Sequence, residues 1–151
     1  GLMAKITFCK IDGTESQIQC LYDMLNKRVH NISHSKNPSY EEHRDFVLNH
    51  PYRFWYIVVK DDLPIGTCYV MESNSVSAFL VDGEEEYLDG VIQFILSNHK
   101  PLEELKSLRP SHFYINVPTG NIDMKERLSK MGWVEIQTTF SLAEPYNISS
   151  E

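Results

Sequence analysis

Residues 82–90 (DGEEEYLDG) lie between a strand-like stretch and an amphipathic, helix-like stretch. The first amides of a helix have no partner within the helix, and the helix dipole favours an anion beside them. A junction of this kind therefore readily binds phosphate. Here it carries five carboxylates instead. The segment is either a phosphate site with unusual charge or a helix N-terminus that its own acids neutralise.

The second interpretation has a local basis. Asp82 is suited to cap the helix, and Glu85 stands where a capping box needs an acid. Three consecutive glutamates at residues 84–86 also suit the positive end of the helix dipole. A metal site at these acids is disfavoured, because adjacent helical residues do not converge on one point.

Histidines are concentrated in the first third of the chain, at His30, His34, His43 and His50. The spacing of four between His30 and His34 would place both on one face of a helix, as in some zinc sites. However, both fall in a polar stretch that we predict to be a loop, without a cysteine or a paired acid in register. The sequence therefore predicts no metal site.

Hydrophobic periodicity predicts the order strand, two helices, three strands, helix, strand, helix, strand. We expect strands at residues 5–11, 54–59, 65–70, 75–81, 112–117 and 133–142, and helices at residues 84–98 and 123–131. Residues 60–64 (KDDLP) are expected to join the second and third strands as a hairpin. The first two helices begin at Thr14 and Ser39, where Gln17 and Glu42 complete capping boxes. A connector with some helical character is expected at residues 101–110. This mixture predicts one central sheet with helices on its faces.

Composition narrows the class of protein. A chain of 151 residues with 42% hydrophobic residues is sufficient for one globular domain, which we expect to span residues 1–151. The net charge of −7 argues against nucleic acid or an anionic membrane as the main partner. The sequence contains no apolar run of membrane-spanning length, and its three cysteines match no disulfide or zinc pattern, so we expect a cytoplasmic protein.

The element order and three groups of motifs resemble the GCN5-related N-acetyltransferase (GNAT) family, which transfers acetyl from acetyl-coenzyme A to amines. Residues 63–67 (LPIGT) are similar to the family's G-x-x-I-G entry into its third strand, and Asn121 followed by Gly132-Trp133 is similar to its last-helix element. Residues 32–34 (ISH), 38–43 (PSYEEH), 46–47 (FV) and 51–56 (PYRFWY) resemble a subgroup that acetylates amino groups on nucleotide-activated sugars.

The resemblance implies a mixed α/β (α+β) fold of GNAT type, with a mostly antiparallel, twisted sheet of about six strands flanked by about four helices. It implies N-acetyl transfer from acetyl-coenzyme A to a small primary amine, in particular an amino sugar, with a homodimer as a further expectation. The residues that it assigns to the cofactor are Phe79, Leu80 and Val81 for the pantetheine arm, Leu88, Asp89 and Gly90 for the pyrophosphate, and Asn121. The residues that it assigns to the acceptor are His34, His43 and Tyr52.

Two departures from the family pattern leave an alternative open. The family's pyrophosphate loop reads (Q/R)-x-x-G-x-(G/A), whereas this chain has Glu85 and Leu88 at the first two defined positions and matches only at Gly90. A carboxylate close to a phosphate repels it, and a leucine side chain keeps the backbone away. The alternative is a catalytically degenerate GNAT-fold binding or regulatory module that no longer binds acetyl-coenzyme A in the usual mode.

The acid and base of the reaction are also not at the family's usual positions. Leu128 stands where many members have a tyrosine acid, and Ser75 and Ser77 stand where many have a glutamate on the fourth strand. Glu72 and His34 are the remaining candidates for the base that removes a proton from the amine.

Overall fold

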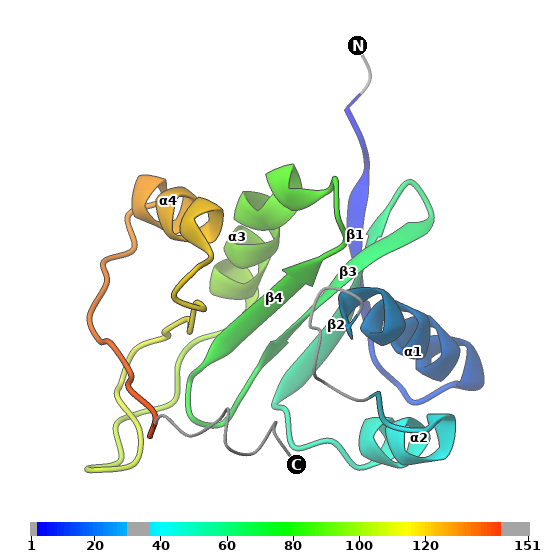
Figure 1. Ribbon diagram of the computed structural model, residues 1–151, viewed down its shortest axis with the longest axis horizontal. Coiled ribbons are helices and arrows are strands. Elements are labelled where there is room, and N and C mark those ends of the chain that lie inside the picture. Colours follow the sequence, from blue (N-terminus) through cyan, green and yellow to red (C-terminus); the bar gives the residue numbers. More distant parts are fainter. Residues whose placement is uncertain (1–2, 30–36, 143–151) are drawn as a thin grey trace.

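The protein is mixed α/β, with one four-stranded antiparallel sheet and helices on both of its faces (Figure 1). The structure, a computed structural model, describes residues 3–29 and 37–142. The strands are β1 (Ile6–Lys10), β2 (Phe54–Lys60), β3 (Leu63–Val70) and β4 (Val76–Leu80), adjacent in that order. The helices are α1 (Glu15–Val29), α2 (Tyr40–Leu48), α3 (Leu88–Asn98) and α4 (Ile122–Lys130), with a short 3-10 helix, η1 (Glu85–Tyr87), before α3. The predicted count of about six strands is therefore too high.

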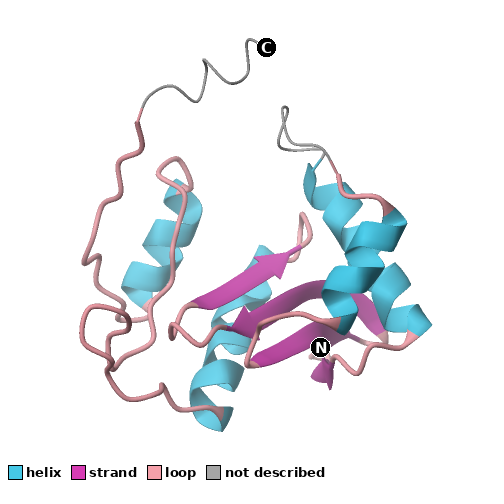
Figure 2. Ribbon diagram, turned by 90° about the horizontal axis from the view of Figure 1, so that it is seen from below, coloured by secondary structure: helices cyan, strands magenta, loops and turns pink. Residues whose placement is uncertain are grey.

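Each face of the sheet has its own apolar core. Helices α1 and α2 lie on one face, whereas α3 lies on the other and packs against α4 (Figures 1 and 2). Because side chains alternate along a strand, β2 contributes Trp55 and Ile57 to the first core and Tyr56 and Val58 to the second. This explains why β2 is almost wholly apolar. No helix in the described residues has both the length and the apolar character needed to cross a membrane.

Both predicted capping boxes are confirmed. The hydroxyl of Thr14 accepts from the amide of Gln17 at 3.3 Å, and Oε1 of Gln17 accepts from the amide of Thr14 at 3.4 Å. The hydroxyl of Ser39 accepts from the amide of Glu42 at 3.1 Å, and Oε1 of Glu42 accepts from the amide of Ser39 at 2.8 Å. These bonds satisfy amides that have no partner within the helix, which fixes where α1 and α2 begin.

The β2–β3 hairpin is confirmed and is tighter than predicted. Its turn consists of Asp61 and Asp62, both with positive φ (47° and 69°), as a two-residue type I′ turn requires. A register shift in the ladder follows at Val58/Val59. Further along β3, a Cβ on Gly66 would stand 2.2 Å from the carbonyl oxygen of Phe79, so only glycine lets β4 approach this closely.

The strand predicted at residues 112–117 does not form. Only Tyr114 bonds to the edge of β4: its carbonyl accepts from the amide of Val76 at 2.8 Å, and its amide donates to the carbonyl of Asn74 at 3.2 Å. The chain then leaves β4, and Ile115 and Val117 pack against the α3–α4 core. Their β-branched side chains are partly buried against this core rather than in a paired strand.

The strand predicted at residues 133–142 does not form either. Trp133 packs against the α3–α4 core, but the stretch after it has no partner strand among the described residues, and Figure 2 draws it as a loop. Its larger apolar side chains are exposed by 69 to 90%, at Val134, Ile136, Phe140 and Leu142. The alternation of apolar residues thus predicted a strand, but no partner strand lies beside this stretch among the described residues.

Residues 101–110, expected to have helical character, form turns that Asn74 holds in place. The side chain of Asn74 is fully buried, accepts from the amide of Leu102 at 2.8 Å and donates to the carbonyls of Leu102 and Pro110 at 2.9 and 2.7 Å. Its φ of 74° is a conformation that asparagine tolerates better than most residues. One side chain therefore connects the β3–β4 turn to the long connector.

We predict that Asn74→Ala lowers the free energy of unfolding by roughly 2–4 kcal/mol, because it leaves three partly buried backbone groups without partners. Asn74→Asp keeps the acceptor for Leu102 but loses both donors, so its cost should also be large. Asn98→Ala is the matched control, because Asn98 makes one exposed bond, to Phe94; it should cost less than about 1 kcal/mol. Urea denaturation measures all three, and an equal loss for Asn74→Ala and Asn98→Ala would contradict the assignment.

Candidate functional site: two cavities that meet beside Phe79

The first cavity lies between helices α1 and α2 and the face of the sheet, and we call it the aromatic cavity. Its volume is about 440 Å³, within the range of small-molecule sites. The residues that line it are Leu21, Met24, Leu25, Arg28, Pro38, Glu42, His43, Phe46, Tyr52, Trp55, Thr67, Tyr69 and Phe79.

Ring contacts fix the wall of the aromatic cavity. Tyr52 stacks on Tyr69 with ring centroids 3.8 Å apart, and Trp55 meets Tyr52 edge-on at 5.0 Å. The indole N–H of Trp55 donates to the hydroxyl of Thr67 at 2.7 Å, and that hydroxyl donates to the carbonyl of Tyr56 at 2.9 Å. The indole N–H of Trp55 and the hydroxyl of Thr67 are therefore already paired, and the rest of this wall consists mainly of ring faces and edges with the hydroxyls of Tyr52 and Tyr69.

Phe46 and Val47, the FV pair of the subgroup motif, differ in burial. Val47 is buried, but the side chain of Phe46 is 44% exposed. Its ring nevertheless contacts Tyr52 and Trp55, with centroids 5.7 and 5.9 Å away, at the margin of the cavity.

His43 is the buried titratable group of this cavity. Its Nε2 lies 3.2 Å from the carbonyl oxygen of Ile18. Because a carbonyl only accepts, Nε2 carries the proton in the neutral ring, which leaves Nδ1 as the basic atom. Burial lowers the pKa of His43 below its ordinary value, so the ring is neutral at pH 7. Burial also raises the pKa of Tyr52, which keeps that hydroxyl protonated.

The second cavity is a cleft of about 790 Å³ between β4 and α4, which we call the β4–α4 cleft. Alternate residues of β4 present their backbone groups to alternate sides. The backbone N–H and C=O groups of Phe79 and Val81 face β3, as the bond from the amide of Val81 to the carbonyl of Ile65 shows. Ala78 and Leu80 therefore direct their N–H and C=O groups outward into the cleft, beyond the point where Tyr114 leaves the edge.

Charges of both signs line the cleft. Its acids are Asp82, Glu85, Asp89, Asp123 and Glu126, and its bases are Arg28, Arg127 and Lys130. The acids come mainly from the β4–α3 loop and the start of α4, whereas two of the bases lie in the last turn of α4. An anion that enters the cleft would meet repulsion at the loop and attraction at the end of α4.

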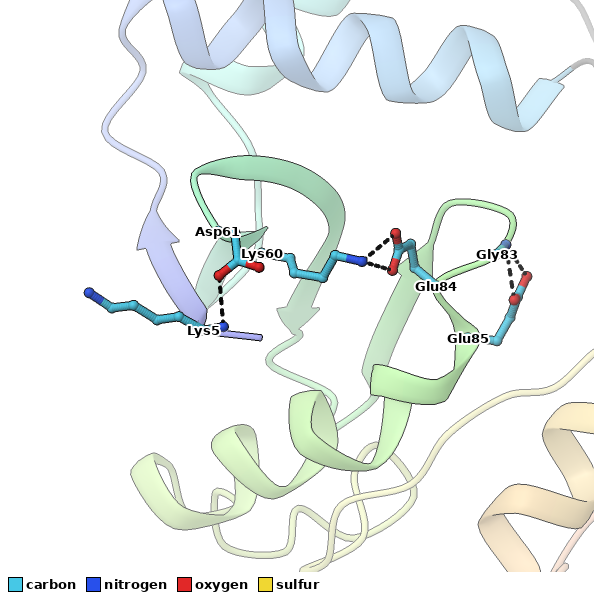
Figure 3. Close-up of polar contacts among 6 residues, drawn as sticks. All are labelled: Lys5, Lys60, Asp61, Gly83, Glu84 and Glu85. Atoms are coloured by element: carbon cyan, nitrogen blue, oxygen red, sulfur yellow. Dashed lines mark hydrogen bonds and ion pairs between the residues drawn. The ribbon is translucent and has the colours of Figure 1, made fainter. Parts of the chain in front are cut away.

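The acidic loop is built differently from the prediction. No side chain caps η1 or α3, so Asp82 is not an N-cap and Glu85 completes no capping box. Instead, the carboxylate of Glu85 turns back to the amide of Gly83, at 3.0 and 3.2 Å, and Glu84 pairs with Lys60 of β2 at 2.7 Å (Figure 3). The Glu84 carboxylate also holds the pKa of Lys60 above its ordinary value.

Leu88 is a core residue as well as a wall of the cleft. It is 6% exposed and packs with Ile92 and Leu128 between α3 and α4. Its amide donates to the carbonyl of Glu85 through the 3-10 turn, so it is not available to a ligand. The same cluster buries Leu128, which stands at the usual position of the family's acid.

The two cavities meet at two shared residues, Arg28 of α1 and Phe79 of β4. The guanidinium carbon of Arg28 lies 5.0 Å from the centroid of the Phe79 ring, a cation–π contact. A molecule in the β4–α4 cleft and another in the aromatic cavity can therefore approach each other beside β4.

The structure brings together most of the residues that the sequence assigned to sites. Phe79, Leu80, Leu88, Asp89 and Asn121 line the β4–α4 cleft, and His43 and Tyr52 line the aromatic cavity. Asn121 also caps α4, because its side chain accepts from the amide of Met124 at 3.2 Å.

Three other candidates do not line the cavity to which the sequence assigned them. Val81 and Gly90 do not line the cleft. Glu72 is an exposed residue of the β3–β4 turn, away from both cavities, where its carbonyl accepts a hydrogen bond from Arg109. His34 falls outside the described residues.

Sequence reasoning missed several residues of both cavities. Trp55 and Tyr69 are direct partners in the β2–β3 ladder, so the predicted hairpin contained the signal that places them side by side. No comparable signal marks Arg28, Arg127 or Lys130, because they reach the cavities only through the packing of α1 and α4 beside β4.

Searches by sequence find no relative: no protein-family model matches the chain, and no curated protein matches it.

Solved structures do match it. A possible acetyltransferase from Clostridium difficile 630 aligns with a TM-score of 0.53 at 14% identity, over 95% of this chain and 98% of that chain. The aminoglycoside N-acetyltransferase AAC(6′)-Iy in complex with coenzyme A aligns with a TM-score of 0.60 at 10% identity, over 95% and 97% of the two chains. The structure of AAC(6′)-Iy with the bisubstrate analogue CoA-S-monomethyl-acetylneamine aligns with a TM-score of 0.57 at 10% identity, over 95% of this chain and 99% of that chain. This chain therefore has the fold of GNAT-type acetyltransferases.

Proposed function

We propose that this protein is an N-acetyltransferase that moves an acetyl group from acetyl-coenzyme A to a small primary amine, and that the amine is carried by an amino sugar. The observation that carries the proposal is the junction beside Phe79, where a cleft with an open strand edge meets a cavity of small-molecule size. Such a junction provides separate places for a donor and an acceptor whose reacting atoms meet.

The open edge of β4 fits the pantetheine arm of the donor. The outward N–H and C=O groups of Ala78 and Leu80 can pair with the amides of an extended chain, as an added strand would. Arg127 and Lys130 at the end of α4 suit the phosphates. Glu85 disfavours phosphate binding, because its carboxylate already accepts from the amide of Gly83 and adds negative charge to the cleft. When bound, acetyl-coenzyme A supplies the thioester that is cleaved.

We assign the proton step to His43. The amine must lose a proton as its nitrogen bonds to the acetyl carbon and the carbon–sulfur bond breaks; a proton from solvent restores the thiol. His43 lines the cavity proposed for the amine, and Nδ1 is its basic atom, because Nε2 is bonded to the carbonyl of Ile18. Glu72, proposed from the sequence, does not line this cavity.

We predict that isothermal titration calorimetry detects micromolar binding of acetyl-coenzyme A, because the open edge of β4 and the two basic residues of α4 outweigh the acidic loop. Desulfo-coenzyme A is the control that keeps the phosphates and pantetheine but lacks the thioester. Absence of heat at millimolar ligand would reject the enzyme proposal.

We predict that Glu85→Gln strengthens acetyl-coenzyme A binding about tenfold, because it removes a carboxylate from the cleft and weakens the contact with the Gly83 amide. Glu86→Gln is the matched control, because Glu86 is exposed, adjacent and outside the cleft lining. An equal gain in both variants would indicate a net-charge effect only. Replacement of Leu88 by glycine is a poor test, because Leu88 is part of the core.

We predict that His43→Gln lowers kcat/KM for the amine about a hundredfold or more and leaves acetyl-coenzyme A affinity unchanged, because glutamine can still donate to Ile18 but is not a base. Since burial lowers the pKa of His43, the neutral, active form persists as the pH falls to 6.5, histidine's ordinary value, and is lost at more acidic pH. The pH profile of kcat/KM should show this acidic limb, and wild-type turnover by His43→Gln would refute the assignment.

A further inference from the structure

We infer that the acceptor combines a flat apolar ring with an anionic group, and that Arg28 is the residue that selects the anion. The inference rests on the proposed acetyl transfer to a primary amine and specifies the class of molecule that carries the amine.

The walls of the aromatic cavity suit a ring. Nine of the thirteen residues that line it are apolar or aromatic. The stacked pair Tyr52–Tyr69 and the edge of Trp55 present flat surfaces, to which another flat group adds by stacking or edge contact.

Few polar groups of the cavity remain for a polyhydroxylated molecule. Thr67 is bonded to Trp55 and to the carbonyl of Tyr56, and Nε2 of His43 to the carbonyl of Ile18. Glu42 is the one carboxylate in the lining, and its Oε1 is used in the cap of α2. The hydroxyls of Tyr52 and Tyr69 are the neutral polar groups that remain in the wall, so a bare sugar would replace few of the hydrogen bonds that it loses to water, and a polycation would find one carboxylate among the described residues.

Arg28 is the cation at the junction of the two cavities. Within the described part of the chain its guanidinium makes no hydrogen bond or ion pair, and it lies over the Phe79 ring. A guanidinium matches a carboxylate or a phosphate with two parallel hydrogen bonds. An acceptor whose anion pairs with Arg28 would hold its ring in the aromatic cavity and its amine beside β4.

Two sources share this chemistry. An aromatic amino acid provides the ring and a carboxylate, and a nucleotide-linked amino sugar provides a base and a diphosphate. Matched probes that differ in the anion separate them: L-phenylalanine against 2-phenylethylamine, and uridine 5′-diphosphate against uridine. Glucosamine 6-phosphate carries the anion without an aromatic ring, and neamine is the polycation.

Calorimetry on the full chain should show that the anionic member of at least one pair binds about tenfold more tightly than its partner. Whichever pair responds identifies the source of the ring. Arg28→Gln should abolish the preference. Lys27→Gln, which removes the same charge from an exposed neighbour outside both linings, should preserve it. Glucosamine 6-phosphate and neamine should bind more weakly than the preferred probe.

The inference is overturned if both members of each pair bind equally, if neamine or glucosamine 6-phosphate binds best, if Arg28→Gln retains the preference, or if no probe binds at millimolar concentration. A parallel titration with acetyl-coenzyme A separates the two proposals. An Arg28-dependent preference without donor binding would place the failure in the proposed reaction rather than in the selectivity of the cavity.

Discussion

The outer edge of β4 determines how the rest of the molecule is arranged. A strand has hydrogen-bonding groups on both edges, and β3 satisfies one set for β4. On the other edge, Tyr114 bonds once and the chain then turns away to pack with α3 and α4. The backbone of Ala78 and Leu80 is consequently left facing a cleft instead of a strand. Polar backbone groups in such a position require water or a ligand, which makes the edge suited to binding.

Contacts at both ends of β4 fix the chain segments around the cleft. Asn74 ties the β3–β4 turn to the connector at Leu102 and Pro110, and Gly66 lets β3 and β4 approach closely where the cleft begins. The ion pair between Lys60 and Glu84 connects the hairpin to the loop before α3. These contacts come from separate parts of the chain, and each holds one border of the cleft in place.

Local signals predicted much of this fold. The capping boxes at Thr14 and Ser39 and the hairpin around Asp61 depend on residues near one another in the sequence, and the structure confirms them. The predicted start of α3 was wrong, because Glu84 pairs with Lys60 and Glu85 accepts from the amide of Gly83, so neither caps the helix.

Long-range pairing was harder to predict. Residues 112–117 and 133–142 have the alternation of strands, but alternation cannot reveal whether a partner edge exists. The same limit applies to the site: His43 and Tyr52 were found through motifs, whereas Arg28 required knowledge of how α1 lies against β4. The fold class was therefore predictable, but the charge at the centre of the site was not.

The unpaired stretch from Val134 to Leu142 has a consequence for the colloidal behaviour of the protein. An extended segment with exposed apolar side chains and free backbone groups is a template for pairing with another chain. The net charge of −7 opposes this, because copies of the protein repel one another before short-range contacts can form. The excess of acidic residues, which places negative charge at one loop of the cleft, thus also helps to keep separate molecules apart in solution.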